Sequence, residues 1–490
     1  MSEIGKTSAH GIFWTMLRVL GQTGISFGVG VLLARLLDVA DFGLMAIAYI
    51  FIGLAELLAS LGVEGALIQR KTLDSRHISV ALTLSVGMAL SLLLLFWLAS
   101  ILAANFFAQP TLEPMLQVLG LGQCCASLAM VPRAMLRREF RFKLLSQIEL
   151  STYIVGYVMI AVPLALLGYG VWSLVIGTCG WLLLSALSMF VAARHHLPRQ
   201  LLWSVVEARD LLHFGLQLTG KYVLNYVANQ SSSLIIGRLL DAYALGLFSR
   251  ATQIAQLPMQ KIAYAFSSVM FPIYASIQHS TAELKQAYLR TVAAVGVLTI
   301  PPLVIAGWQA EVVVEGLFGE KWLPAAPVFS ALCVAAIFNC ILHLSGALVE
   351  ASNQISAEIK RQISYFVLII LGFALASRYG IEAIAWVAAL AAAYLYLIMS
   401  QLVLKLIKCS WGEYLRVQAP AAGISTILLL IVIPAFATIQ GSLPNAPLRL
   451  TALIAIAASG YITLFLLTPD RWMFGAKAKL FEKLRKRRNS

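Results

Sequence analysis

The chain has 490 residues, of which 60% are hydrophobic and only 12% are charged. Soluble globular proteins carry about 25% charged residues, so too few charges remain here to cover a water-facing surface. The composition therefore excludes a soluble globular protein and indicates that lipid surrounds most of the chain. A net charge of +14 is also found in proteins that bind nucleic acid, so the positions of the basic residues along the chain matter.

Long apolar runs occupy the chain almost from end to end. A helix needs about 20 apolar residues to cross the hydrocarbon core, and only helices and closed barrels satisfy their own backbone in lipid. The runs are too long for barrel strands, so we expect an all-α membrane protein of about fourteen transmembrane helices. They cover residues 11–34, 43–65, 78–104, 115–132, 147–168, 171–193, 211–236, 244–267, 289–310, 325–349, 361–377, 381–404, 416–436 and 448–468.

The basic residues predict the orientation of these helices, because cytoplasmic loops are enriched in Lys and Arg. With the N-terminus in the cytoplasm, 27 of the 36 Lys and Arg residues fall in cytoplasmic segments and 5 fall on the opposite face. Both termini are therefore expected in the cytoplasm. Because the charge is spread over many loops, membrane insertion explains it without a nucleic-acid partner.

The sequence contains an internal repeat with an offset of 203 residues. The segment RLLDVADFGL at 35–44 recurs as RLLDAYALGL at 238–247, with six of ten positions identical. Both copies are expected on the outer face, which predicts two parallel halves. In transporters built from repeats, the substrate site commonly lies between the halves.

The same offset aligns polar residues in the preceding apolar runs. Three residues spaced i, i+4 and i+8 share one face of a helix, and each half carries such a trio. The pairs are Arg18 with Lys221, Gln22 with Asn225, and Ser26 with Asn229. We interpret the stripes as the basic lining of a hydrated cavity; snorkelling of Arg18 and Lys221 to the headgroups is the alternative.

Two further charged residues are candidates for the site. Glu56 lies in the second apolar run, where it is a candidate for binding a proton or cation or for pairing with Arg18. Arg250 is a candidate at the outer mouth of the cavity. Other polar residues within the runs, Gln123 among them, are expected to form hydrogen bonds between helices. We find no metal-ligand spacing and no catalytic constellation.

Several motifs resemble the polysaccharide transporter branch of the multidrug/oligosaccharidyl-lipid/polysaccharide flippase superfamily, and in particular exporters of colanic-acid type. The resemblance covers nearly the whole chain. The motifs that show it are LARLL at 33–37 with DFGL at 41–44, GVEGALIQRK at 62–71, the arginine-rich segment from Pro132 to Phe142, Phe271-Pro272, and FGEKW at 318–322.

The resemblance implies the V-shaped architecture of multidrug exporters and peptidoglycan-precursor flippases in the bacterial inner membrane. Residues 1–205 and 206–408 would form two six-helix lobes, 409–470 two additional helices, and 471–490 a basic cytoplasmic tail. It also implies export of an undecaprenyl-pyrophosphate-linked oligosaccharide by alternating access. Partners would be this substrate, membrane lipid and polysaccharide polymerase or assembly proteins. No cofactor is expected apart from a coupling ion, H⁺ or Na⁺.

Two other functions compete with this interpretation. A cation-coupled multidrug exporter would require buried carboxylates, for which Glu56 is the candidate here. A membrane glycosyltransferase or polysaccharide polymerase would require a long outer loop with catalytic residues, whereas the longest outer loop here spans only about 311–324. We therefore expect a transporter and not an enzyme.

Overall fold

The computed structural model describes residues 21–60, 63–70, 74–195, 198, 201–205, 226 and 230–468. Every regular element within these ranges is a helix. Eleven of the helices are long and apolar enough to cross a membrane, so the expectation of an all-α multi-pass membrane protein is confirmed. The chain divides into two compact units, Met1–Gly246 and Leu247–Ser490.

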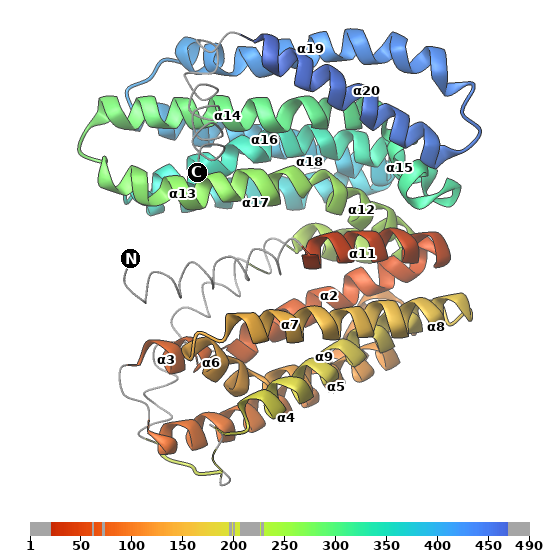
Figure 1. Ribbon diagram of the computed structural model, residues 1–490, viewed down its shortest axis with the longest axis vertical. Coiled ribbons are helices and arrows are strands. Elements are labelled where there is room, and N and C mark those ends of the chain that lie inside the picture. Colours follow the sequence, from red (N-terminus) through yellow and green to blue (C-terminus); the bar gives the residue numbers. More distant parts are fainter. Residues whose placement is uncertain are drawn as a thin grey trace, which may run out of the picture. The chain divides into compact units, whose positions relative to one another are not determined.

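The first unit is a bundle of long helices, with α4, α5 and α9 lying side by side (Figure 1). It begins, in the described range, with a helix over residues 21–36. The elements that follow are α2 (Val39–Ser60), α3 (Val63–Gln69), α4 (Ser75–Phe107), α5 (Leu112–Leu128), α6 (Met130–Arg138), α7 (Phe142–Ile154), a π-helical segment (Val155–Ala161), α8 (Val162–Leu166), α9 (Val171–Ala193) and α11 (Ser231–Leu239).

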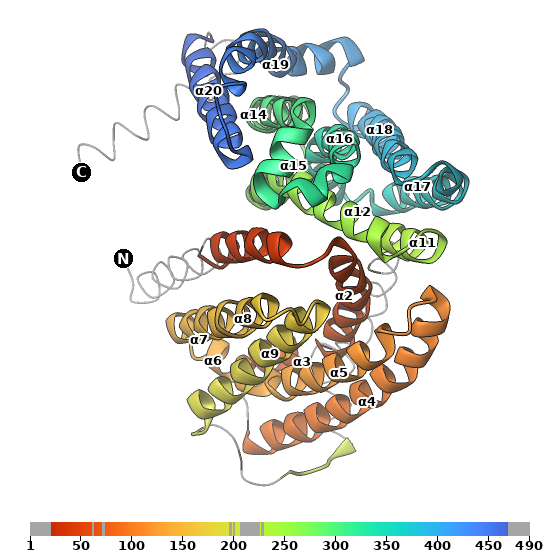
Figure 2. The same cartoon turned by 90° about the vertical axis from the view of Figure 1, so that its right-hand side faces the viewer.

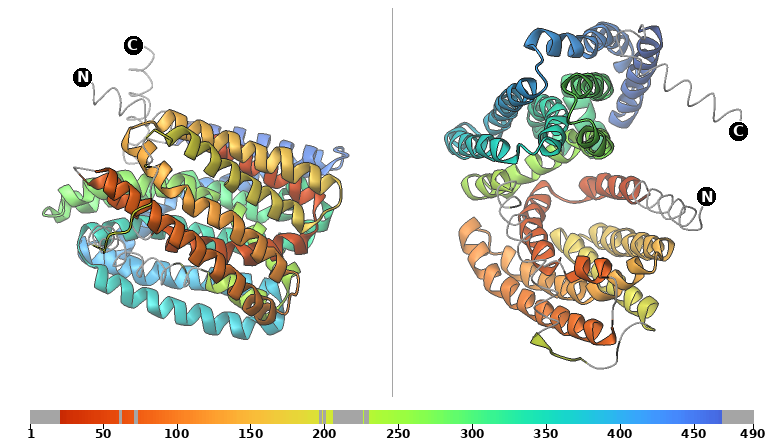
Figure 3. Two further views of the ribbon diagram at one scale, coloured as in Figure 1. Left: turned by 90° about the horizontal axis from the view of Figure 1, so that it is seen from below. Right: turned by 90° about the vertical axis from the view of Figure 1, so that its left-hand side faces the viewer.

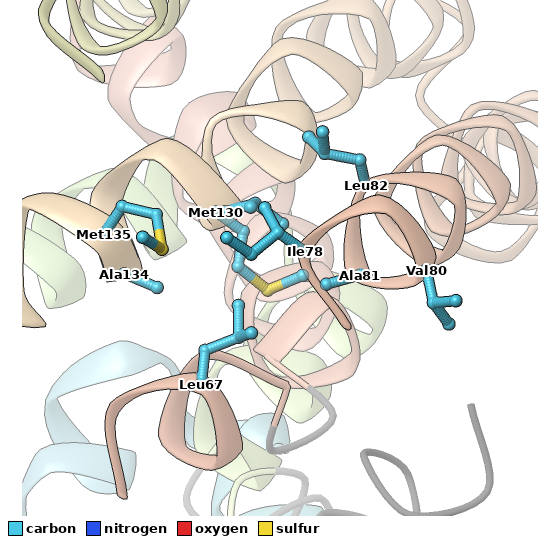
Figure 4. Packing of buried hydrophobic residues seen from close by; sticks show 9 residues of the cluster. Leu67, Ile78, Val80, Ala81, Leu82, Met130, Ala134 and Met135 are labelled. Carbon is cyan, nitrogen blue, oxygen red and sulfur yellow. The ribbon is translucent and has the colours of Figure 1, made fainter. Parts of the chain in front are cut away.

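A small apolar cluster fixes the short helix α3 to the bundle (Figure 4). Leu67 of α3 is completely buried and packs between α4 and α6. Its neighbours are Ile78, Val80, Ala81 and Leu82 of α4 and Met130, Val131, Ala134 and Met135 of α6. Each buried aliphatic side chain contributes about 1.5–3 kcal/mol, which is enough to hold a helix of only seven residues in place.

The second unit is a second helical bundle, with α19 and α20 packed along one side of α14 (Figure 2). Within each unit, the long helices lie roughly parallel or antiparallel to one another (Figure 3). The elements are α12 (Ala242–Ala255, whose first turn lies in the first unit), a π-helical segment (Met259–Ala263), α13 (Tyr264–Ser276), α14 (Thr281–Trp308), α15 (Ala310–Phe318), a 3₁₀ segment (Glu320–Ala325), α16 (Ala326–Ala351), α17 (Ile355–Ala376), α18 (Ile381–Leu406), α19 (Trp411–Gln440) and α20 (Ala446–Leu467).

Within the second unit, polar contacts as well as apolar packing attach the last two helices, α19 and α20, to α14. Lys285 of α14 forms an ion pair with Glu413 of α19 at 2.6 Å. Pro301 lies inside α14 and has no N–H to donate to the carbonyl of Val297. The hydroxyl of Tyr461, on α20, donates to that carbonyl at 3.1 Å.

Eleven of the fourteen predicted apolar runs coincide with membrane-spanning helices of the structure. The runs 11–34 and 211–236 lie partly outside the described residues. The run 244–267 is not one regular α-helix: α12 ends at Ala255, and a π-helical segment after Pro258 leads into α13. The total of fourteen, the predicted lobe boundaries at 205 and 408, and the tail at 471–490 stay predictions.

Candidate functional site

An Asp carboxylate caps the start of a helix in each copy of the repeated motif. In the second copy, the Asp241 carboxylate accepts a hydrogen bond from the backbone N–H of Ala244 at 2.7 Å, in the first turn of α12. In the first copy, Asp41 accepts from the backbone N–H of Asp38 at 3.1 Å, just before α2. The two contacts are the two halves of a capping box. Under the 203-residue offset Asp241 corresponds to Asp38, which in the first copy is the N–H donor, so the two copies cap their helices with carboxylates from different positions.

The glycines of the two copies lie where the first turns of α2 and α12 contact each other. A Cβ atom added to Gly43 would collide with the backbone oxygen of Ala242, and one added to Gly246 would collide with that of Val39. Under the 203-residue offset, Gly43 corresponds to Gly246 and Val39 to Ala242. The two copies therefore pack on each other with pseudo-twofold exchange, a contact that the sequence comparison did not predict.

A cavity of about 140 Å³, with several polar side chains in a largely apolar wall, opens within the helices of the first unit. It lies among α2, α5 and α9, which pack on one another. The residues that form its wall are Tyr49, Ile52, Gly53 and Glu56 of α2, Gln123 of α5, and Thr178, Trp181 and Leu182 of α9. The positions on α2 are spaced i, i+3, i+4 and i+7, so they share one helix face.

Hydrogen-bonded hydroxyl groups order one side of this cavity. The hydroxyls of Tyr49 and Tyr157 are 3.3 Å apart, and Tyr157 is 2.9 Å from the hydroxyl of Thr178. Thr178 in turn donates to the carbonyl of Leu174 at 2.8 Å. Tyr226 donates to the carbonyls of Tyr49 and Ile50, at 3.0 and 3.2 Å, and fits there because position 53 is glycine.

Other polar groups of the cavity have no partner among the described residues. Gln123 is only 1% exposed, yet its Nε2 makes no hydrogen bond there. The indole Nε1 of Trp181 is likewise buried without a partner in this part of the chain. A buried polar group left unpaired costs about 1–3 kcal/mol, so these two N–H donors point to a ligand or to water.

The structure gives Gln123 a role different from the one predicted. We expected a hydrogen bond between helices, whereas its amide nitrogen lines a cavity without such a bond. Because a single amide in an apolar run is compatible with either role, the sequence could not distinguish them. Its nearness to Glu56 was not evident either, since 67 residues separate them.

Only some of the predicted site residues lie in the described ranges. Arg18, Lys221, Asn225 and Asn229 lie outside them, so the paired stripes stay a prediction. Gln22 and Ser26 are half-buried on the helix over 21–36. Glu56 is exposed and lies at the rim of the cavity. The positive charge of Arg133, on α6, attracts the negative charge of its carboxylate. Arg250 donates to Gln253 of the same helix at 2.6 Å.

Two of the motifs behind the family resemblance meet at one end of the first unit. Arg137 of α6 forms an ion pair with Glu64 of α3 at 2.7 Å. Arg138 donates to the backbone carbonyls of Leu67 at 2.8 Å and of Arg70 at 2.6 Å, where α3 ends. A cation at these carbonyls complements the negative end of the helix. The arginines of this motif therefore hold α3, in addition to any role in topology.

The groups that line the cavity can bind a ligand through hydrogen bonds. No group of three or more His, Cys, Asp or Glu among the described residues could hold a metal ion. The cavity offers N–H donors, hydroxyls, an aromatic ring and one carboxylate, which together suit a neutral polar ligand. It lies among helices long enough to span a membrane.

Comparison with known proteins identifies a family that the sequence matches and a solved structure with a similar fold. A family model described as "Polysaccharide biosynthesis protein" matches residues 32–327. The lipopolysaccharide biosynthesis protein WzxC of Escherichia coli K12 is 26% identical over 391 residues, which are 77% of this chain and 78% of WzxC. The succinoglycan biosynthesis transport protein ExoT of Rhizobium meliloti strain 1021 is 28% identical over 67% of this chain and 66% of its own length. The solved structure of the lipid II flippase MurJ, inward closed, has a TM-score of 0.69 at 13% identity, covering 92% of this chain and 98% of MurJ.

Proposed function

The chain belongs to the polysaccharide biosynthesis protein family, and from this premise we propose that it moves a lipid-linked oligosaccharide across the bacterial inner membrane. The cargo is a repeat unit on undecaprenyl pyrophosphate, carried from the cytoplasmic to the outer face by alternating access. It would serve exopolysaccharide, O-antigen or capsule assembly. The family match over residues 32–327, in a chain with eleven membrane-spanning helices, carries this proposal.

The physical need for such a protein follows from the chemistry of the cargo. Transfer of hydroxyl groups and an ionised pyrophosphate into hydrocarbon is very unfavourable without hydrogen-bond partners or opposite charge. A polar cavity within membrane helices lowers that barrier. The first unit contains such a cavity, with donors and acceptors on three helices.

Transport is favoured over enzymatic synthesis. One relative is named as a transport protein of succinoglycan biosynthesis, and the fold is that of a lipid flippase. The family and its relatives are transport proteins rather than enzymes.

The finer parts of the proposal rest on the sequence. Arg18 and Lys221 would face the pyrophosphate, with Gln22, Asn225, Asn229 and Arg250 lining the same path. A H⁺ or Na⁺ gradient would be coupled through Glu56. Both termini would lie in the cytoplasm, as the distribution of Lys and Arg favours. A polymerase on the outer face would receive the exported unit.

Deletion of the gene tests this function. Loss of the transporter should abolish the surface polysaccharide and cause the lipid-linked oligosaccharide to accumulate in the inner leaflet. Membrane vesicles of known orientation, treated with a membrane-impermeant periodate reagent, report the leaflet. The gene on a plasmid should restore both. Unchanged surface polysaccharide and an unchanged leaflet distribution in the deletion strain would contradict the proposal.

A further inference from the structure

The cavity of the first unit lies near the middle of the membrane. Its walls come from α2, α5 and α9, which are the first, third and fifth of five successive spans and therefore run in the same direction. Tyr49, Gln123 and Trp181 each lie about ten residues from the start of their helix, or roughly 15 Å at 1.5 Å per residue. That is about half of a hydrocarbon core of roughly 30 Å.

The floor and the rim of the cavity have complementary chemistry. The floor is formed by Gln123 and Thr178, which are 1% and 2% exposed. Two N–H donors, Nε2 of Gln123 and Nε1 of Trp181, have no partner among the described residues. The rim carries the carboxylate of Glu56, which in its ionised form accepts hydrogen bonds and donates none.

This combination distinguishes between classes of ligand. A metal cation or a proton would bind the Glu56 carboxylate but leave both N–H donors unsatisfied. A phosphate would accept from the N–H donors but would be repelled by the carboxylate. A hydroxyl group both donates and accepts, so neighbouring hydroxyls on one molecule can satisfy the floor and the rim together. Water can do the same when no ligand is bound, and a hydroxylated ligand would replace several water molecules at once.

The size of the cavity restricts the ligand further. Its volume of about 140 Å³ corresponds to roughly five water molecules at about 30 Å³ each. Pockets for drug-sized ligands are about 300–1,000 Å³. The cavity is therefore too small for a whole repeat unit, and it matches a single ring. The indole of Trp181 packs against the stacked rings of Tyr153 and Tyr157, at centroid distances of 5.5 and 6.2 Å, and gives one wall a rigid apolar surface.

We propose that this cavity is a binding site for one sugar ring of the cargo, formed by Gln123, Trp181 and Glu56. The proposal rests on the function proposed above and specifies the part of the cargo that the first unit recognises. The N–H groups of Gln123 and Trp181 donate to sugar hydroxyls, and Glu56 accepts from one.

The test compares two lipids binding to the purified full-length protein. One is undecaprenyl pyrophosphate without sugar, and the other is the lipid-linked oligosaccharide extracted from the gene-deletion strain. The wild type should bind the glycosylated lipid at least about tenfold more tightly, since two or more hydrogen bonds are added. Equal affinity for the two lipids would overturn the sugar site and leave the proposed function standing. Binding of neither lipid would contradict the proposed function and this inference with it.

Two variants remove one N–H donor group each. Gln123→Leu replaces the amide by an apolar group of similar size, and Trp181→Phe keeps an aromatic ring without the N–H. Each should weaken binding of the glycosylated lipid about two- to tenfold and leave the affinity for undecaprenyl pyrophosphate unchanged. Glu56→Gln should weaken it by more than about tenfold, because bonds to charged groups are stronger.

A matched control and a stability measurement separate this role from a structural one. Thr252 of α12 also carries a buried hydroxyl without a partner in the described ranges, but it does not line the cavity. Thr252→Val should bind both lipids as the wild type does. Gln123→Leu should unfold at the wild-type temperature or higher, because an unpaired polar group is replaced by an apolar one. The sugar site is ruled out if Gln123→Leu and Trp181→Phe bind the glycosylated lipid as tightly as the wild type, or if both variants lose affinity for the two lipids equally. It is also ruled out if Glu56→Gln abolishes transport without weakening the binding of the glycosylated lipid.

Discussion

Pro301 removes a hydrogen-bond donor from the middle of α14, and a side chain from another helix replaces it. The carbonyl of Val297 would normally accept from the N–H four residues later, which proline lacks. Tyr461 of α20 donates to it instead, at 3.1 Å, and packs beside Val297, Ala421 and Ile424. One hydroxyl thus satisfies a backbone group in lipid and attaches the last helix to its unit.

Tyr461→Phe should therefore destabilise the second unit by about 1–3 kcal/mol, the cost of an unsatisfied buried carbonyl. The measurement is the thermal unfolding temperature of the purified protein. Tyr379→Phe serves as the control, because Tyr379 is 82% exposed and should change nothing. Equal unfolding temperatures for Tyr461→Phe and the control would mean that the carbonyl does not depend on Tyr461.

At the scale of elements, the contact between α2 and α12 explains why glycine recurs in the repeat. The two helices approach so closely that neither Gly43 nor Gly246 has room for a side chain. Small residues allow such close packing in membrane helices, where lipid provides no hydrophobic driving force between them. Asp38 and Asp241 mark the residues immediately before these helices. The repeated motif thus lies at the start of both helices and lets their first turns pack against each other.

Gly43→Ala and Gly246→Ala should each lower stability by about 1–3 kcal/mol, as overpacking does. The reason is that the added methyl group meets backbone, which cannot rotate away. Gly87→Ala on α4 is the control, since nothing lies within 4 Å of the added atom. Unfolding in graded denaturant measures the difference. If all three variants unfold alike, Gly43 and Gly246 do not lie against the backbone of the other copy.

Most of the helices could be predicted from apolar runs alone, because lipid as a solvent imposes a length and a composition on every span. The run 244–267 shows the limit of that reasoning. It is mostly apolar, with Arg250 and Lys261 as its charged residues, but Pro258 and a π-helical segment interrupt the regular helix. The candidate site was predictable only in part. Glu56 was evident as a charge in an apolar run, whereas Gln123 and Trp181 join it only through the packing of α2, α5 and α9.

At the scale of the whole molecule, the repeat and the family together indicate a carrier for a large anionic lipid. An ionised pyrophosphate in a low-dielectric region is very unfavourable unless fixed positive charge offsets it. The sequence provides one basic residue in register in each half, Arg18 and Lys221. We expect these two to act on the pyrophosphate, while the cavity of the first unit recognises the sugar.

Arg18→Ala and Lys221→Ala should each reduce the surface polysaccharide restored to a deletion strain, with normal protein abundance in the membrane. Arg18→Lys should retain more activity than Arg18→Ala, because Lys keeps the charge but not the bidentate grip on phosphate. Lys360→Ala removes an exposed positive charge on α17 and should have no effect. Full restoration by the Arg18→Ala, Lys221→Ala double variant would exclude the cationic mechanism.

The transbilayer movement of the cargo by the purified protein tests the central claim most directly. Liposomes containing the lipid-linked oligosaccharide, with and without an imposed H⁺ or Na⁺ gradient, are treated with a membrane-impermeant periodate reagent. Protein-free liposomes should leave the inner-leaflet glycan protected, whereas liposomes with the protein should expose nearly all of it to oxidation over time. An inner pool that stays protected under every gradient, with correctly folded protein present, would contradict a flippase.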